Sequence, residues 1–108
     1  MKKIDLPQGT LDLLVLRLLS SGEMHGWGIA QRLNLLSNDA LQLQEGTLYP
    51  ALYRMEAKGW IVAEWAQSEN NRRAKYYSLT RQGRKQLAAE QEQWERMTAI
   101  IGLVMHAT

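Results

Sequence analysis

The sequence predicts a small, mostly helical α+β fold, and three observations lead to this prediction. Apolar residues recur at helical spacing in three short segments within residues 10–58. Residues 60–79 change to two short β-type runs around a polar turn. Residues 81–105 then return to helical periodicity over a much longer stretch. Together these observations predict three short helices, a β-hairpin and a long last helix.

The three short helices are expected at residues 10–20, 26–36 and 47–58. Thr10 and Thr47 can cap the first and third, because a hydroxyl accepts hydrogen bonds from the free amides of a first turn. Pro50 then falls in the first turn of the third helix, where its missing N–H costs little. The apolar stripes that should pack together are Leu11, Leu14, Val15, Leu18 and Leu19, then Ile29, Ala30, Leu33 and Leu36, and finally Leu48, Leu52 and Met55.

A two-stranded antiparallel hairpin is expected next. Residues 60–65 are aromatic and β-branched, which predicts the first strand. Residues 67–73 are polar and are expected to form the turn, and residues 75–79 are expected to form the second strand. A lone hairpin is only marginally stable, so its aromatic face should pack on the helices.

The long last helix is expected over residues 81–105, with Thr80 as its N-cap. At 1.5 Å per residue it spans roughly 38 Å, whereas a compact chain of this length is roughly 34 Å across. Its far end must overhang, and an apolar overhang indicates a partner surface. We therefore expect residues 1–79 to form one domain and residues 80–108 a dimerisation helix. The apolar seam of that helix consists of Leu87, Trp94, Met97, Ile101 and Val104.

Positive charge is concentrated in one part of the chain, although the formal net charge is only +2. Residues 46–86 carry eight Lys and Arg and three Glu, which gives +5, so the rest of the chain carries −3. Residues 72–85 hold six basic side chains and no acidic one. This distribution fits a surface that binds a polyanion, and it also fits an ordinary solvated face.

Several function classes are excluded by what the sequence lacks. Without cysteine there is no disulfide scaffold, thiol nucleophile or Cys-based metal site. His25 and His106 are too far apart in sequence for a local metal motif, and His25 is expected to be a turn and cap residue. No nucleophile–base pairing or phosphate-binding Gly loop occurs, so neither an enzyme nor a cofactor is expected. The lack of a membrane-length apolar run or a signal peptide predicts a cytoplasmic protein.

The order of three helices, hairpin and long helix is that of a winged helix-turn-helix. In such folds the recognition helix, here residues 47–58, enters the major groove of double-stranded DNA. The hairpin forms the wing, whose basic side chains can reach phosphates or the minor groove. A winged helix can also bind proteins, so a protein-interaction module without DNA binding stays open as the alternative.

The chain also resembles the PadR family of bacterial transcriptional regulators, in particular its small members with a single C-terminal helix. The matching segments are Gly9-Thr10-Leu11-Asp12, His25-Gly26-Trp27-Gly28-Ile29-Ala30, Gly46-Thr47-Leu48-Tyr49-Pro50-Ala51-Leu52, Lys58-Gly59-Trp60-Ile61 and Lys75-Tyr76-Tyr77-Ser78-Leu79-Thr80-Arg81-Gln82-Gly83. They cover nearly the whole chain in order. The resemblance implies a homodimer that represses transcription from a palindromic operator and is released by a small molecule or another signal.

Seven residues are candidates for DNA contact: Thr47, Tyr49, Tyr53, Arg54, Arg72, Arg73 and Lys75. The first four lie on the expected recognition helix, where hydroxyls and a guanidinium can meet phosphates or a base edge. The last three flank the wing turn. Tyr49 has an alternative as a half-buried, internally bonded aromatic, and Arg54 as the ion-pair partner of Glu56 or another neighbour. Glu69 at the wing tip would repel phosphate, and Trp27 is expected in the core.

Trp94 has two interpretations. In small members of the family the final helices of two subunits face each other, and an aromatic residue there can border a flat hydrophobic pocket for a small aromatic or cationic effector. The simpler interpretation is that Trp94 packs the dimer interface, together with Met97 and Ile101 of the same stripe.

Overall fold

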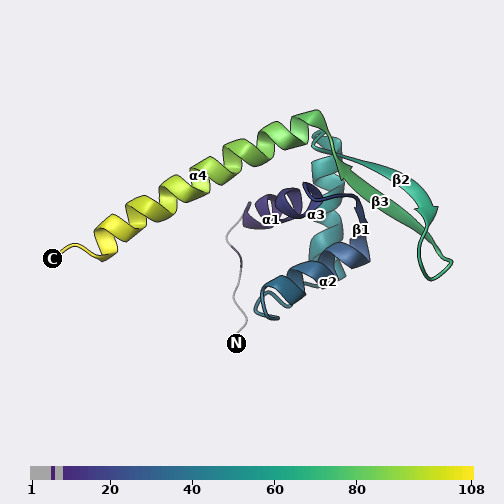
Figure 1. Cartoon of the computed structure of the whole chain (residues 1–108), viewed down its shortest axis with the longest axis horizontal. Coiled ribbons are helices and arrows are strands. Elements are labelled where there is room, and N and C mark those ends of the chain that lie inside the picture. Colours follow the sequence, from purple (N-terminus) through teal and green to yellow (C-terminus); the bar gives the residue numbers. More distant parts are fainter. Residues whose placement is uncertain (1–5, 7–8) are drawn as a thin grey trace.

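The computed structural model describes Leu6 and residues 9–108. The segment 1–5, where the sequence predicts no signal peptide, lies outside the described residues. In chain order the elements are α1 (Thr10–Leu19), β1 (Met24–His25), α2 (Gly26–Leu36), α3 (Glu45–Ala57), β2 (Ile61–Gln67), β3 (Arg73–Leu79) and α4 (Arg81–Met105). This order confirms the mostly helical α+β fold with a hairpin wing and a long last helix (Figure 1).

The core lies where α1, α2 and α3 pack together against the sheet. Its largest fully buried side chains are Val15, Leu16, Leu19, Ile29, Leu48, Leu52, Met55 and Ile61. Two residues that the sequence predicts to face the core are instead exposed. Trp27 is 49% exposed and Leu36 is 59% exposed. Both lie on the flanks of α2, Leu36 roughly 70° and Trp27 roughly 110° around the helix from the middle of its buried face.

The sheet has three antiparallel strands in the order β1–β3–β2, rather than the two strands that the sequence predicts. β2 and β3 pair along their whole length and form the wing. The additional strand, β1, consists only of Met24 and His25, which pair with Tyr77 and Tyr76. Two residues are too few to show alternation, so no sequence pattern marks this strand. It ties the start of α2 to the middle of the wing.

Two predicted N-caps are wrong, and the start of α3 is misplaced as well. α1 begins at Thr10 itself, after Gly9 in the left-handed conformation, so Thr10 is not the N-cap. α3 begins at Glu45, which places Thr47 inside the first turn and moves Pro50 to the second turn. Neither start carries a side-chain cap, and a prediction based on capping residues therefore assigns both N-caps wrongly.

The start of α4 is fixed as predicted, with Thr80 as its N-cap. The Thr80 hydroxyl accepts from the amide of Gly83 at 3.0 Å and donates to the carbonyl of Gly59 at 2.6 Å. Gly83 is buried in this turn, and a Cβ at its position would overlap the carbonyl oxygen of Trp60. α4 therefore leaves the domain in a direction set by close backbone contact.

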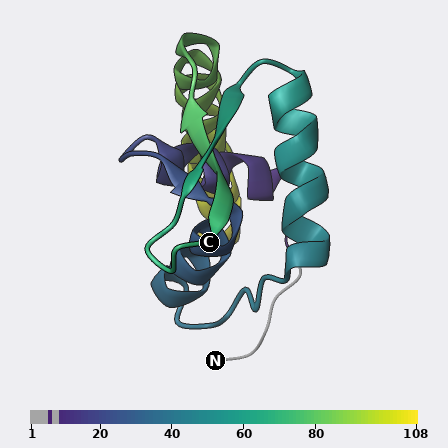
Figure 2. The same ribbon diagram turned by 90° about the vertical axis from the view of Figure 1, so that its right-hand side faces the viewer.

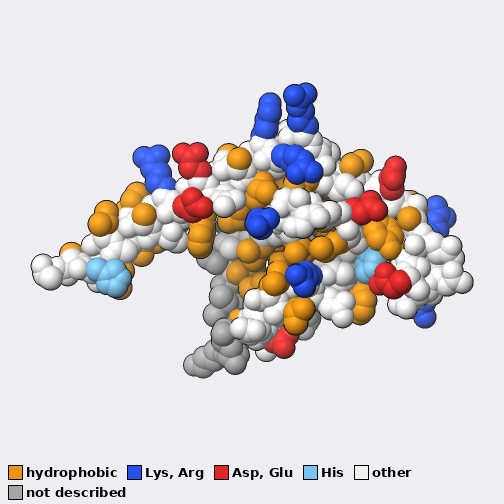
Figure 3. Space-filling model, in the orientation of Figure 1, with side chains coloured by type: hydrophobic (Ala, Val, Ile, Leu, Met, Phe, Trp, Pro, Cys, Tyr) orange, Lys and Arg blue, Asp and Glu red, His pale blue; other side chains and the backbone are white. Residues whose placement is uncertain are grey.

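The far half of α4 extends well beyond the domain. Leu87 packs on the core, whereas the side chains from residue 91 onward are exposed. The chain measures 58 × 33 × 21 Å, and α4 runs along the long dimension in Figure 1 and is foreshortened behind the wing in Figure 2. Hydrophobic side chains cover much of this overhang in Figure 3.

Candidate nucleic-acid interface

α3 has one apolar side against the core and one polar, aromatic side toward solvent. The buried side consists of Leu48, Ala51, Leu52 and Met55. The exposed side holds Thr47, Tyr49, Tyr53 and Arg54. Tyr53 is the most open of the large side chains here, at 76% exposure. This side presents hydroxyls and a guanidinium together, which are groups that contact DNA backbones and base edges.

Tyr49 packs against the start of α2 and still reaches solvent. A Cβ added at Gly26 would lie 2.5 Å from Cε1 of Tyr49 and 2.7 Å from its hydroxyl oxygen, so the ring occupies the space that a side chain would need. Burial, the Glu45 carboxylate and Tyr77 raise the pKa of Tyr49 above its ordinary value of 10.0. The phenol is therefore protonated at neutral pH and available as a donor.

Replacing Gly26 with alanine should displace Tyr49. We expect Gly26→Ala to destabilise the fold by about 1–3 kcal/mol, because the methyl group overlaps a packed ring. The displaced phenol should also titrate closer to 10.0. Gly46→Ala is the matched control, since a Cβ at Gly46 meets nothing within 4 Å. Denaturant unfolding and absorbance titration of tyrosine measure both effects, and equal stability of the two variants would contradict the packing of Tyr49 on Gly26.

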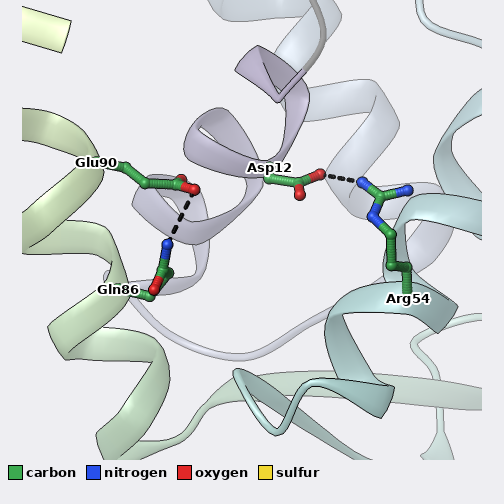
Figure 4. A network of polar contacts seen from close by, with 4 residues as sticks. All are labelled: Asp12, Arg54, Gln86 and Glu90. Atoms are coloured by element: carbon green, nitrogen blue, oxygen red, sulfur yellow. Dashed lines mark hydrogen bonds and ion pairs between the residues drawn. The ribbon is translucent and has the colours of Figure 1, made fainter. Parts of the chain in front are cut away.

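Arg54 links α3 to α1. Its Nη2 donates to Oδ1 of Asp12 at 2.5 Å (Figure 4). The Asp12 side chain is only 7% exposed, whereas that of Arg54 is 49% exposed. The partner of Arg54 is thus a buried carboxylate on another helix and not Glu56. A guanidinium has five N–H donors, so this ion pair leaves other donors of Arg54 on the solvent side.

Lys75 links the wing to α3. Its Nζ donates to Oε1 of Glu56 at 3.2 Å and lies 5.6 Å from the centre of the Tyr77 ring. The hydrogen bond to Glu56 raises the pKa of Lys75 above its ordinary value of 10.5. Lys75 is therefore charged at neutral pH, and one of its three donors is already used. The Lys75–Glu56 bond holds the half of β3 nearer the wing turn beside α3.

The other predicted wing contacts, Arg72 and Arg73, are both exposed. The Arg73 guanidinium lies 5.1 Å from the centre of the Trp65 ring, a cation–π arrangement. Trp65 is opposite Lys75 in the strand register and is itself exposed. Figure 3 shows Lys and Arg side chains at the wing tip and around the start of α4. The wing therefore combines two arginines with an exposed indole, a residue that the sequence analysis did not single out.

The predicted role of His25 as a cap is confirmed, since its Nδ1 accepts a hydrogen bond from the amide of Gly28 at 2.9 Å. Its Nε2 lies 3.8 Å from Oε1 of Glu69, the wing-tip carboxylate. Its ring stacks with Trp27 at a centroid distance of 6.0 Å. Glu69 is thus directed toward α2. Trp27 and Arg72 border a cavity of about 380 Å³ between α2 and the wing turn.

The five predicted residues of α4 do not all share one environment. Leu87 packs against the core of its own chain. Trp94, Met97, Ile101 and Val104 are at least half exposed, and no other part of the described chain covers them. The structure therefore separates Leu87 from the other four, which form the apolar overhang.

Within the described residues, no group of three side chains is suitably placed to bind a metal ion. In the same part of the chain, no helix is both long and apolar enough to cross a membrane.

Residues 15–89 match the family model described as the transcriptional regulator PadR-like family. This match spans more than half of the chain. The chain belongs to the PadR-like family. PadR-family proteins are transcriptional regulators that bind DNA and are not enzymes, so this chain is a transcriptional regulator.

Relatives of this PadR-family regulator are similar to it in sequence along most of its length. An uncharacterised protein of Lysinibacillus sphaericus is 31% identical over 97% of this chain and 96% of its own length. The transcriptional regulator Rv3488 of Mycobacterium tuberculosis is 32% identical over 79% of this chain and 76% of its own. The crystal structure of a PadR family transcription regulator from Clostridium difficile R20291 is 30% identical, with a TM-score of 0.78, and covers 90% of this chain and 99% of its own.

Proposed function

We propose that this PadR-family regulator is a homodimeric repressor that binds a palindromic operator and is released by a small-molecule or stress signal. Residues 1–79 would bind DNA, and residues 80–108 would dimerise. The observation that carries the proposal is the shared exposed surface of α3 and the wing, where aromatic, hydroxyl and basic side chains lie within the segment of charge +5. Such a surface is the electrostatic footprint of a nucleic-acid site.

The seven candidate residues divide into three groups in this proposal. Arg72 and Arg73 contact phosphates, and Thr47, Tyr49 and Tyr53 reach the backbone or base edges from α3. Arg54 and Lys75 each hold an acidic side chain of the same chain and offer their remaining donors to DNA. These two ion pairs position α3 relative to α1 and the wing relative to α3. They also neutralise part of the positive surface, which is the observation that favours the protein-interaction alternative.

Dimerisation would bring together the apolar overhangs of two α4 helices, with Trp94 facing its counterpart. In a two-fold dimer the recognition helices meet two half-sites about one helical turn, 34–36 Å, apart. Such an arrangement explains why a chain this small exposes so much apolar helix. A flat aromatic effector would act between the two Trp94 rings.

Selection of bound DNA fragments from a random pool, repeated at two salt concentrations, tests the proposal directly. We expect a palindromic site and an affinity that falls steeply with salt, because phosphate contacts release counterions. Affinity that does not depend on salt, or the recovery of no preferred site, would favour the protein-interaction alternative.

The contribution of the wing can be measured separately. We expect Arg72→Ala and Arg73→Ala each to reduce the slope of log K against log salt by about 0.9, the value for one phosphate contact. Arg96→Ala is the matched control, because Arg96 is an exposed arginine on the overhang of α4 and not on the proposed DNA surface. A slope that changes as much for Arg96→Ala as for the wing variants would contradict a phosphate contact by the wing.

A further inference from the structure

The half of the wing nearer its turn has two faces of different character. Alternate residues of a strand point to opposite faces, and Lys75, which bonds Glu56 of α3, marks the face toward α3. Trp65 lies directly opposite Lys75 in the strand register, and Arg73 lies two residues before Lys75 on the same face. The face toward α3 therefore carries an indole, a guanidinium and an ammonium group.

The acidic side chains of the wing lie on the other face. Glu64 pairs with Tyr76 across the ladder, so it points away from α3. Glu69 of the turn approaches His25, whose ring contacts Tyr76 edge-on at a centroid distance of 5.3 Å. Within the described strands β2 and β3, the face toward α3 has no acidic residue. Because DNA is a polyanion, this distribution indicates that the face toward α3 is the one turned to DNA.

The Trp65 indole is held in place on this face but is not covered. The Arg73 guanidinium lies 5.1 Å from the centre of its ring, and the residue is still 59% exposed. A cation over the face of an indole is attracted to it, so Arg73 restrains the ring. The open edge of the ring combines an apolar surface with an N–H group that can donate a hydrogen bond but cannot accept one.

The minor groove of DNA matches this edge in width and in chemistry. The groove is about 6 Å wide, and an A·T pair presents only acceptors there. A G·C pair adds the amino group of guanine, which is a second donor and cannot pair with the indole N–H. A narrow A·T-rich minor groove also attracts arginine through its enhanced negative potential. An indole beside an arginine is therefore suited to A·T-rich sequence.

The position of the wing in the chain places this contact at the outside of the operator. Figure 1 shows the wing and the overhang of α4 at opposite ends of the long dimension, with α3 between them. In a dimer joined through α4, the two wings therefore lie farther from the two-fold axis than the recognition helices do. Each wing then meets the minor groove that flanks its half-site on the outer side.

We propose that Trp65 enters the minor groove at the outer flank of each half-site and selects A·T-rich sequence there. The proposal rests on the proposed DNA-binding function and names a specificity-determining residue for it. Arg73 positions the indole and contacts a phosphate at the rim of the groove. Each half-site is then recognised by α3 through the major groove and by Trp65 through the minor groove.

Titration of duplexes that differ only in their flanks tests this proposal. Each duplex carries the palindrome recovered by selection, flanked by about five base pairs, half a helical turn, of A·T, G·C or inosine·C. Inosine keeps the major-groove acceptors of guanine and lacks its minor-groove amino group. We expect A·T and inosine flanks to bind similarly and about fivefold or more tighter than G·C flanks, the effect of one mismatched base pair. Inosine flanks that bind as weakly as G·C flanks would overturn minor-groove selection.

Variants of the wing identify the residue that carries the preference. Trp65→Ala should bind A·T and G·C flanks alike, and Trp65→Phe, which keeps a ring but loses the N–H, should lose part of the preference. Val62→Ala is the matched control, because Val62 is a 51% exposed apolar residue of the same strand on the opposite face. It should keep the full preference. If Trp65→Ala weakens binding to all three duplexes by the same factor, or changes none of them, the proposal is overturned.

The same measurements separate failure of this proposal from failure of the proposed function. A palindrome that is recovered, but whose A·T and G·C flanks bind the parent protein alike, would overturn the role of Trp65 and leave DNA binding intact. The recovery of no preferred site would overturn both proposals.

Discussion

Gly83→Ala is expected to destabilise the protein by about 2–3 kcal/mol, although alanine is the better helix former. Gly83 is buried in the first turn of α4, where a Cβ would overlap the Trp60 carbonyl oxygen and lie 3.0 Å from Cδ2 of Leu79. Backbone cannot move aside as a flexible side chain can. Relief would require α4 to shift away from the Thr80 cap, which breaks the bonds that fix the helix start.

The matched control for this prediction is Gly102→Ala in the same helix. A Cβ at Gly102 meets nothing within 4 Å, so the substitution should stabilise α4 by up to about 1 kcal/mol through helix propensity. The same chemical change is thus expected to have opposite signs at the two ends of one helix. Denaturant unfolding of the two variants measures this, and a Gly83→Ala protein as stable as the parent would show that α4 does not pack as closely as described.

The fold could be predicted from the sequence where its signals are local and repeated. The periodicity of α2 and α4 gives their bounds as the structure has them, because many residues contribute to each pattern. Thr80 is also predictable, since a hydroxyl before a helix has one usual role. β1 is not, because its two residues are held by pairing with Tyr76 and Tyr77, some fifty positions away in the chain.

The candidate site was predictable as a surface but not as a set of contacts. Charge and topology locate α3 and the wing. They cannot show that Arg54 reaches Asp12, which is 42 residues earlier, because such pairs depend on how the helices pack. Trp27 illustrates the same limit. Its neighbours Gly26 and Ile29 are buried, and only the angular position of Trp27 on α2 leaves it exposed beside the wing.

Arg54→Met is expected to cost about 2–3 kcal/mol of stability, and more than Asp12→Asn. Removing the guanidinium leaves the Asp12 carboxylate buried without its partner, and an uncompensated buried charge is strongly destabilising. Removing the carboxylate instead leaves Arg54, whose side chain is half exposed and can turn to water. The single variants should therefore be unequal. Adding Asp12→Asn to Arg54→Met should restore at least about 1 kcal/mol, because the buried group is then neutral.

DNA titration of the same variants separates the two roles of Arg54. Asp12→Asn keeps the guanidinium, so the slope of log K against log salt should stay as in the parent. Arg54→Met removes a charge from the proposed interface and should lower that slope by about 0.9 if the guanidinium also meets a phosphate. An unchanged slope, together with the loss of stability, would mean that Arg54 acts only by fixing α3 to α1. The orientation of the recognition helix would then depend on a residue that never touches DNA. The affinity for DNA would have to come from Arg72, Arg73 and the exposed tyrosines of α3.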